Sequence, residues 1–480
     1  MAGQRKFGLV VLGAGYMGQN VLEAFPHIRG AVAELDVEMH LEAVVDPNPG
    51  NLERGLILAQ RQTASVRSFE RLDPKTVSHL NALLTESKTY DSILIYDATP
   101  PEFHFTHMQF IGELYERGLS IYYLGEKPLL VDLDHVKDLR IRTRLDNVWC
   151  EFIEVTNPVV TGAQRFLEDS QATVLSGWFW RASTTGIRWA IGDARSGVTG
   201  GALLDKGPHD LAITNAFLQP EGFEVTAAQI PLFMLHPDAF QGGELAFLTL
   251  SGKRIAGIHT DLDHIEDLPA DAHFAGTIKW AVKDSEVQIG YLFSWIGLTK
   301  GPEETAYIRS LNSLGITNDQ WLDLGGQRTS KSGIHQYRDE EVRMAVLDIK
   351  IGNDDAQLIC NFLEKHGRTK RFAVVKVKGE TIWQYPERAD ETAPETTPEA
   401  HYRETKQREL ASVFKKVVSH VIGGQTARDF LGRDAALLVH DALLKMQQAA
   451  YFKWGEKLRD AQRELQRRVW SAKNDSEGSL

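Results

Sequence analysis

Short apolar runs alternate with helical patterns over the first 150 residues of the chain. Such alternation is typical of a parallel β-sheet covered by helices, because strands buried on both faces are apolar throughout. Over His104–Arg117 the apolar residues recur at helical spacing, and Gly118 follows where a helix would end. The predicted strands are Phe7–Leu12, His40–Asp46, Ile93–Asp97, Ser120–Leu124 and Asn147–Ile153, with a weaker one over Ser65–Phe69.

From about residue 170 to residue 386, alternating and β-branched segments dominate. They predict a mostly β second domain built on one large open sheet with few helices, one of which starts at Pro208 and His209. The predicted strands are Thr173–Trp180, Phe223–Leu232, Glu244–Leu250, Thr277–Val282, Glu286–Phe293, Val342–Ile351, Arg371–Val377 and Thr381–Tyr385.

The C-terminal part begins with a segment rich in Pro, Thr and Glu, Glu387–Glu399, which predicts a solvated linker. Helical patterns follow over Arg403–His420, Asp434–Tyr451 and Phe452–Trp470. We therefore expect a first domain over residues 1–150, a second over 151–386, an acidic linker over 387–402 and C-terminal helices over 403–480. The fold class is α/β.

Composition narrows the classes of partner. A formal net charge of −12 argues against nucleic acid or an anionic membrane, because both attract a basic face. No apolar stretch is long enough to span a bilayer, so no membrane partner is expected. Only two cysteines occur, Cys150 and Cys360, which predicts neither a disulfide framework nor a thiolate metal site. We expect a cytoplasmic protein without a metal.

A glycine-rich turn, Gly13-x-Gly15-x-x-Gly18, follows the first predicted strand and precedes the helical segment Gln19–Phe25. Its glycines allow a tight turn, close approach of a pyrophosphate and close packing of helix on strand. The positive end of the helix dipole attracts the phosphates. The pattern therefore predicts a dinucleotide site.

Asp46 ends the second predicted strand, where an acidic side chain can accept hydrogen bonds from the adenosine ribose. A carboxylate also repels a 2′-phosphate, which favours NAD over NADP. Its distance from Gly18 exceeds the roughly 20 residues of the usual pattern, and a longer loop around Arg29–Glu38 would absorb the excess. The alternative is a turn or capping aspartate, which Asp-Pro frequently is.

Residues that could bind a ligand or take part in a reaction follow two further predicted strands. Thr99 and Pro100 follow the strand ending at Asp97, and Glu126-Lys127-Pro128 follows the strand ending at Leu124. Ligands of open parallel sheets lie beyond the carboxyl ends of the strands. An ammonium group at Lys127 could therefore hydrogen-bond a substrate oxygen and stabilise negative charge developing on it.

An imidazole stands at the predicted start of the helix Asp210–Leu218. The helix dipole there disfavours a protonated ring, which suits His209 as a base. Asp205 precedes it by four residues and could orient the histidine or hydrogen-bond the substrate. A lone histidine is more often structural than catalytic, so the nearby carboxylate and glycines are needed for this hypothesis.

These motifs together resemble the glucose–fructose oxidoreductase / inositol dehydrogenase / rhizopine-catabolism (Gfo/Idh/MocA) family. The resemblance implies an N-terminal Rossmann domain with a doubly wound parallel sheet and a C-terminal α/β domain with a large, open, mostly antiparallel sheet. It also implies NAD(P)-dependent oxidation or reduction of a sugar, cyclitol or related polyol. The motifs are Gly13–Gly18, Asp46, Ala98-Thr99-Pro100-Pro101 with His104, Glu126-Lys127-Pro128, and Gly200-Gly201 with Asp205-x-Gly207-x-His209.

The resemblance also implies site roles. Lys127 would contact the reacting oxygen, His209 would exchange its proton, and Asp205 would position the substrate or the histidine. A cis bond before Pro128 would aim Lys127, and a late helix would pack back on the first domain. The expected cofactor-binding residues are Gly13, Gly15, Tyr16, Met17, Gly18, Asp46, Thr99, Pro100, His104, Glu126 and Lys127.

Departures from the family pattern bear on the substrate. Glu154-Val155-Thr156 replaces an aromatic–Arg–Phe run, which removes a common cationic substrate contact. Several aromatic and basic side chains could stack on or clamp a sugar, with core or salt-bridge roles as the alternative. These residues are Trp178, Trp180, Arg181, Arg188 and Trp189.

Three functions remain open at this point. The leading one is an NAD(P)-dependent dehydrogenase or reductase with a small sugar or polyol substrate, assembled as a homo-oligomer (dimer or tetramer). The second is an NAD-dependent glycosidase of the same family, which would show no net change in nicotinamide absorbance. The third is a regulator that senses a nucleotide or sugar, against which the combination of Lys127, Asp205 and His209 argues.

Overall fold

The protein divides into two compact units. The first contains Met1–Pro158, Glu364–Thr369 and Asp390–His440, and the second contains Val159–Leu363, Lys370–Ala389 and Asp441–Leu480. The structure, a computed structural model, describes residues 4–63, 65–141, 147–182, 201–235, 244–249, 254–259, 270–294, 342–363, 371–386, 398–423 and 430–450.

A six-stranded sheet forms the centre of the first unit. Its strands are β1 (Arg5–Leu12), β2 (Val37–Val45), β3 (Arg67–Phe69), β4 (Ser92–Asp97), β5 (Ile121–Gly125) and β6 (Val148–Cys150). They lie in the order β3-β2-β1-β4-β5-β6, and all neighbouring pairs are parallel. This is the strand order of a Rossmann fold, whose ligands bind beyond the carboxyl ends of β1 and β4. The predicted doubly wound parallel sheet is confirmed.

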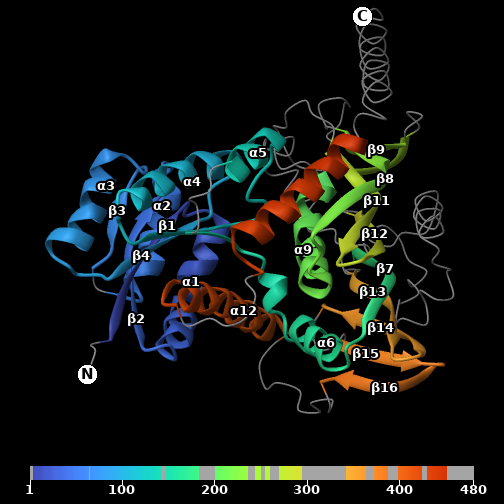
Figure 1. Ribbon diagram of the computed structural model, residues 1–480. Helices are drawn as coiled ribbons and strands as arrows, with labels where there is room; N and C mark the ends of the chain where they lie inside the picture. Colours follow the sequence, from blue (N-terminus) through green and yellow to red (C-terminus); the bar gives the residue numbers. More distant parts are fainter. Residues whose placement is uncertain are drawn as a thin grey trace, which may run out of the picture. The chain divides into compact units, whose positions relative to one another are not determined.

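Helices cover both faces of this sheet. They are α1 (Tyr16–Ala33), α2 (Pro49–Gln60), α3 (Pro74–Asn81), α4 (Pro101–Glu116), α5 (Leu133–Ile141) and α12 (Pro398–Val421), with single turns η1 (Ala82–Glu86) and η2 (Ile153–Thr156). Figure 1 shows α1 and α12 on one face of the sheet and α4 and α5 on the other. Because both faces are covered, β4 is buried along its whole length.

The first helix is longer than the sequence pattern predicts. It continues to Ala33 although Pro26 lies inside it, and its inward residues, among them Phe25, Ile28 and Val32, are buried. The predicted loop over Arg29–Glu38 is therefore wrong, because most of the extra residues before β2 extend the helix. Packing of the apolar face outweighs the single hydrogen bond that a proline removes.

A ten-stranded sheet forms the centre of the second unit. Its strands are β7 (Thr173–Ala182), β8 (Gly222–Leu235), β9 (Glu244–Thr249), β10 (Arg254–His259), β11 (Ala270–Val282), β12 (Ser285–Ser294), β13 (Val342–Ile351), β14 (Asp354–Asn361), β15 (Phe372–Val377) and β16 (Glu380–Tyr385). The order is β10-β9-β8-β11-β12-β7-β13-β14-β15-β16. Among these neighbours only β12 and β7 run parallel. The predicted large, mostly antiparallel sheet is confirmed.

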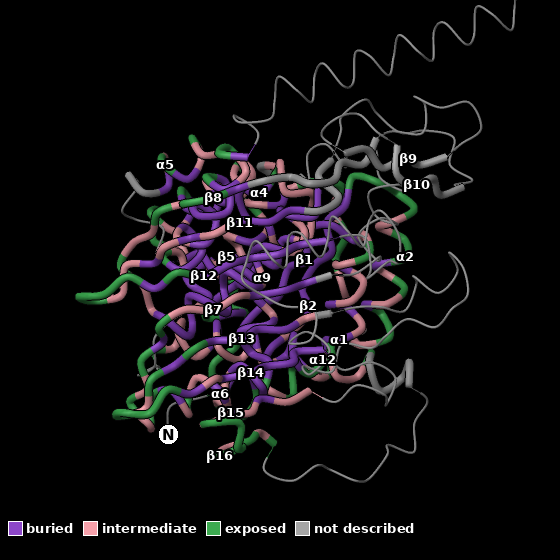
Figure 2. Tube along the Cα trace, turned by 90° about the vertical axis from the view of Figure 1, so that its right-hand side faces the viewer, coloured by how far each residue is buried: buried purple, intermediate pink, exposed green. Residues whose placement is uncertain are grey.

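Among the described residues, α6 (Pro158–Asp169) and α9 (Gly201–Leu218) accompany this sheet, and α9 packs on β7, β11 and β12. A buried chain of hydrogen bonds joins α9 to the sheet. The indole of Trp280 donates to the Tyr291 hydroxyl at 2.9 Å, and that hydroxyl donates to Thr214 of α9 at 2.9 Å. Figure 2 shows buried residues concentrated along the central strands and α9.

In the described part of the C-terminal region, two helical segments follow the sheets. Residues 433–450 are helical, as predicted, and the part up to His440 belongs to the first unit while Asp441 onward belongs to the second. The other late helix, α12, starts at Pro398, inside the predicted linker. The predicted helix over 452–470, the segment 301–335 and residues 387–397 lie outside the described residues.

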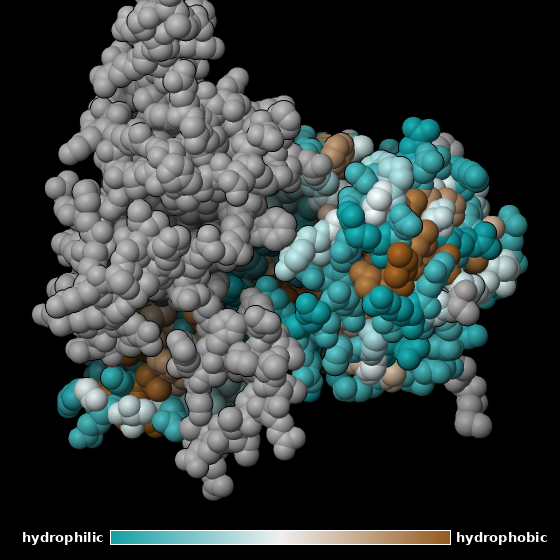
Figure 3. All heavy atoms as spheres, turned by 180° about the vertical axis from the view of Figure 1, so that it is seen from behind, coloured by the Kyte–Doolittle hydropathy of each residue, from teal (hydrophilic) through white to brown (hydrophobic). Residues whose placement is uncertain are grey.

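None of the helices described is long and apolar enough to cross a membrane. Figure 3 shows that the described surface on the side opposite to Figure 1 is mostly hydrophilic, with hydrophobic side chains gathered in a patch on the right and in another at the lower left.

Candidate functional site

The turn after β1 is built on positions where a side chain has no room. Gly13 has a φ of +80°, and a Cβ there would lie 2.8 Å from the carbonyl group of Ala98, at the end of β4. A Cβ at Gly18 would lie only 1.8 Å from the carbonyl oxygen of Gly13. Both glycines are therefore required by the local fold, whatever the turn binds.

The middle of this turn is open. A Cβ at Gly15 would meet no heavy atom within 4 Å, and as the N-cap residue of α1 it makes no side-chain capping hydrogen bond. Tyr16 is 58% exposed and Met17 is half-buried. Helix-start amides beside an open glycine fit the pyrophosphate of a dinucleotide, because they offer N–H donors and a positive dipole end.

Asp46 fastens this turn to the end of β2. It is buried, and its two carboxylate oxygens accept hydrogen bonds from the backbone amides of Ala14 at 2.6 Å and Asn48 at 2.7 Å. The turn role weighed against ribose binding is thus present, while Asn48 caps α2. A carboxylate has about four lone-pair positions, so the two roles are compatible.

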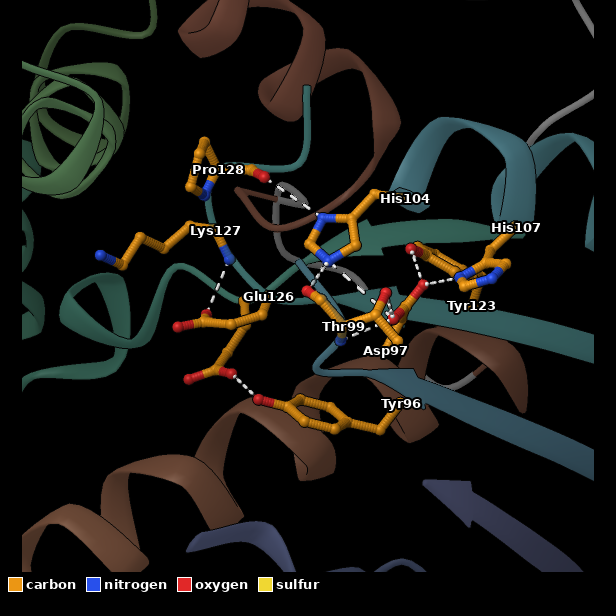
Figure 4. A network of polar contacts seen from close by, with 10 residues as sticks. Tyr96, Asp97, Thr99, His104, His107, Tyr123, Glu126, Lys127 and Pro128 are labelled. Atoms are coloured by element: carbon orange, nitrogen blue, oxygen red, sulfur yellow. Dashed lines mark hydrogen bonds and ion pairs between the residues drawn. The ribbon is translucent and has the colours of Figure 1, made fainter. Parts of the chain in front are cut away.

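A buried carboxylate, Asp97, organises the end of β4 (Figure 4). It accepts hydrogen bonds from the backbone amide of Thr99 at 2.9 Å, His107 at 2.7 Å and the Tyr123 hydroxyl at 2.8 Å. Burial by itself would raise the pKa of Asp97, but the nearby imidazole of His104, together with these hydrogen bonds, holds it well below its usual value. Asp97 is therefore a stable internal anion.

The histidine of the fourth-strand motif lies inside the protein. The ring of His104 is 1% exposed, with Nε2 2.8 Å from the carbonyl oxygen of Thr99 and Nδ1 3.2 Å from that of Pro128. Its Nε2 is 3.9 Å from Asp97, and Pro100 stands between Thr99 and the first turn of α4. Because both ring nitrogens face backbone carbonyl oxygens, we assign His104 a supporting role in the loop, and its predicted contact with the cofactor stays a prediction.

Glu126, Lys127 and Pro128 follow β5 directly, and the Lys127–Pro128 bond is cis, as the resemblance implied. The Glu126 carboxylate accepts a hydrogen bond from the backbone amide of Lys127 at 2.7 Å. Figure 4 shows the Lys127 side chain pointing away from the Asp97–His104 cluster. Burial raises the pKa of Glu126, against the opposing charge of Lys127.

A second buried carboxyl group lies near this loop. The Tyr96 hydroxyl donates a short hydrogen bond to Glu151, the residue after β6. Burial, reinforced by the charge of Glu126, raises the pKa of Glu151 well above its usual value, although the charge of Lys127 opposes the shift. Glu151 therefore keeps its proton at pH values where an exposed glutamate has lost it.

His440, in the helix at residues 433–450, contacts the segment after β5 that contains Lys127 (residues 126–129), which we call the lysine loop. The ring is fully buried, its Nε2 accepts a hydrogen bond from the backbone amide of Leu129 at 2.8 Å, and its Nδ1 lies 2.7 Å from the carbonyl oxygen of Ala436. Burial lowers the pKa of His440 to about 4.

In the second unit, α9 is buried except at three residues. Within this helix only Asp205, Lys206 and His209 are partly exposed, and an ion pair joins Asp205 to Lys206 at 3.1 Å. Residues four apart lie on one helical face, so Asp205 and His209 share it. These two are the residues chosen from the sequence, and Lys206 was missed.

The predicted helix start at His209 is wrong. The helix begins at Gly201, so His209 lies in its interior and Pro208 is an internal proline. A neutral ring cannot be argued from the helix dipole, whose effect is confined to the first turn. Burial of the whole helix tolerates the hydrogen bond that Pro208 cannot donate.

The sugar-clamp alternative is wrong for two of its five residues. Arg181 is 2% exposed and forms an ion pair with Asp210 at 2.7 Å, and Trp180 is fully buried. Arg181 therefore joins β7 to α9, and Trp180, the residue before it on β7, belongs to the core on the opposite face of the strand. Trp178 packs on the apolar cluster that contains Met344. Arg188 and Trp189, like Gly200 of the motif, lie outside the described residues.

Sequence reasoning missed the buried part of the site. Asp97 ends a predicted apolar strand and Glu151 lies inside another, so a charged residue there was a usable signal. Tyr96, Tyr123 and His107 gave no such signal. In the described part of the chain, no group of three or more His, Cys, Asp or Glu side chains is placed to hold a metal ion.

No protein-family model and no curated protein matches this chain. Solved structures do match its fold. A point mutant of KijD10, a 3-ketoreductase from Actinomadura kijaniata, in complex with TDP-benzene and NADP, is 13% identical with a TM-score of 0.53, covering 93% of this chain and 98% of that chain. GenD2 from gentamicin A biosynthesis, in complex with NAD, is 16% identical with a TM-score of 0.51, covering 94% and 95%.

A third match is UDP-N-acetylglucosamine 3-dehydrogenase GnnA from Acidithiobacillus ferrooxidans, 13% identical with a TM-score of 0.50, covering 93% of this chain and 98% of that chain. At these identities the likeness shows a shared fold over nearly the whole length of the chain.

Proposed function

We propose that this protein is an NAD(P)-dependent oxidoreductase of the Gfo/Idh/MocA type, acting on a carbinol or carbonyl group of a sugar, cyclitol or related polyol. The observation that carries the proposal is the turn after β1, where Gly13 and Gly18 have no room for a Cβ while Gly15 is open. Proteins of the same fold include an NADP-bound ketoreductase and NAD-bound GenD2.

In the proposed reaction a nucleotide exchanges the hydride, and side chains of the protein exchange the proton. A nicotinamide nucleotide, when bound, supplies the hydride acceptor or donor. In the oxidation direction, Lys127 hydrogen-bonds the substrate hydroxyl oxygen and stabilises charge on it, while His209 accepts the hydroxyl proton. Asp205, one turn before His209 and paired with Lys206, positions the substrate or the imidazole.

The proposed nucleotide contacts follow from the same turn. The amides of Tyr16 and Met17 at the start of α1 hold the pyrophosphate, and Asp46 keeps lone pairs for the adenosine ribose. A buried carboxylate at that position disfavours a 2′-phosphate, so we expect tighter binding of NADH than of NADPH. Thr99, Pro100, His104 and Glu126 stay predicted cofactor contacts. The homo-oligomer and the cytoplasmic location also stay predictions.

The test is a panel of sugars and cyclitols with NAD⁺ and NADP⁺, followed by absorbance of the reduced nicotinamide and by product analysis. The proposal expects net reduction of the nucleotide with at least one polyol. Release of a glycosidic leaving group without net reduction would instead support the NAD-dependent glycosidase. Nucleotide and sugar binding without turnover of any panel member would support the regulator and contradict the enzyme.

A further inference from the structure

The single peptide group that joins Pro128 to Leu129 is held from both of its ends by buried histidines. His104 lies 3.2 Å from its carbonyl oxygen, and His440 accepts its N–H at 2.8 Å. This peptide group comes directly after Lys127–Pro128. The two rings come from α4 and from the helix at residues 433–450, which are more than 300 positions apart in the chain.

The tautomer of His440 follows from its partners. The carbonyl oxygen of Ala436 can only accept, so Nδ1 carries the hydrogen, and Nε2 is left with the lone pair that the Leu129 amide needs. The ring is fully buried and stacks against Phe152 with centroids 5.9 Å apart. A neutral ring in this orientation is the form that burial favours.

Contacts with Thr99 and Asp97 orient the ring of His104. Its second nitrogen lies 2.8 Å from the carbonyl oxygen of Thr99, and Asp97 stands 3.9 Å away. The peptide after Lys127–Pro128 is thereby connected to the loop between β4 and α4 as well as to the C-terminal helix. With both polar atoms of the peptide held, rotation of this peptide plane would break two buried hydrogen bonds.

We propose that His440, together with His104, is a positioning residue that fixes the backbone from which the Lys127 side chain extends. The inference rests on the proposed function for its catalytic consequence, and on the hydrogen bonds alone for its structural part. We call the two histidines and the Pro128–Leu129 peptide group that they hold the clamp. Misplacing a catalytic group by about 1 Å costs on the order of 100-fold in rate, so the clamp controls turnover without touching substrate.

Two substitutions of the full chain test the clamp. His440→Leu removes the acceptor for the Leu129 amide, and His440→Gln offers a carbonyl oxygen in place of Nε2. The matched control is His79→Leu, which removes a partly buried histidine bonded to Glu42 at 2.8 Å, far along the sheet from the lysine loop. The readouts are hydrogen exchange of the Leu129 amide, the pH dependence of Lys127 acylation by acetic anhydride read by mass spectrometry, kcat, and NADH affinity.

In His440→Leu we expect Leu129 exchange to be at least about 10-fold faster and the pH profile of Lys127 acylation to shift. We also expect kcat to fall about 10- to 100-fold with NADH affinity kept within about 3-fold. His440→Gln should recover most of each effect, and His79→Leu should show none. The clamp is overturned if His440→Leu folds and matches His79→Leu in all readouts. If His440→Leu does not fold, His440→Gln decides. The clamp is then overturned if His440→Gln loses the protection of the Leu129 amide while Lys127 acylation and kcat stay unchanged.

The two proposals fail differently. Exchange and acylation need no substrate, so they report on the clamp even if no polyol is oxidised. If Leu129 exchange and Lys127 acylation change in His440→Leu, but the wild type turns over no polyol, the clamp is supported and the proposed function is contradicted. Turnover, Leu129 exchange and Lys127 acylation that are all normal in His440→Leu would contradict the clamp and sustain the proposed function.

Discussion

Gly13 and Gly18 are fixed by contacts within the protein, whereas Gly15 is not. The distinction matters because all three match one sequence pattern, yet only the first and third are excluded from carrying a Cβ. A glycine-rich pattern therefore mixes positions needed for folding with a position needed for close approach of a ligand.

This distinction gives a prediction. Gly18→Ala should lower the free energy of unfolding by about 3 kcal/mol, because its Cβ would lie 1.8 Å from a backbone oxygen that cannot move alone. Gly15→Ala, the matched control, should change it by less than about 1 kcal/mol. Urea unfolding of both variants checks the difference, and equal stability of the two would refute this account of the turn.

The residues found from sequence and those missed differ in what they depend on. Lys127 and Asp46 follow strand ends that local patterning reveals, so they were found. The partner that holds the backbone after Lys127 comes from a distant segment: His440 accepts from Leu129 across 311 positions. A single sequence contains no signal for such a pairing, because burial of one of sixteen histidines depends on tertiary packing.

The element that departs most from expectation is α9. Local rules place Pro208 at the first turn of a helix, where its missing N–H costs nothing. The helix instead begins seven positions earlier at Gly201, whose φ is +74°, and is buried almost throughout. Tertiary burial decided the start of the helix, and propensity did not.

The helix at residues 433–450 leads to a prediction about pH. His440 has a pKa of about 4 in the folded protein against about 6.5 when unfolded, so between these values the unfolded chain binds more protons. The contribution of His440 to stability is therefore present above pH 6.5 and is lost as the pH falls towards 4. Relative to His440→Gln, the wild type should lose about 1.4 kcal/mol per pH unit across this window.

Urea unfolding of the wild type and His440→Gln between pH 4 and pH 7 measures this difference. Comparing the two proteins cancels the titration of the carboxyl groups that they share. A difference in unfolding free energy that stays constant with pH would show that the histidine is not held neutral.

Across the whole chain, sequence patterning predicted both sheets, their order along the chain and the parallel character of the first. The family resemblance, and not the patterning, implied that a late helix packs back on the first domain; α12 and residues 433–440 belong with the first unit although they follow the second sheet in sequence. Which unit a helix belongs to depends on contacts between segments that are far apart in the chain. The spacing of hydrophobic residues in the sequence does not reveal those contacts.

The central proposal is that Lys127 and His209 both serve the NAD(P)-dependent reaction of a polyol hydroxyl. The measurement is kcat, with NADH affinity alongside, for wild type, Lys127→Met, His209→Asn and the double variant, using the best polyol of the panel. We predict that each single change lowers kcat at least about 100-fold with NADH affinity within about 3-fold, and that the double variant is little worse than either. Turnover near the wild-type rate in either single variant would contradict the assignment.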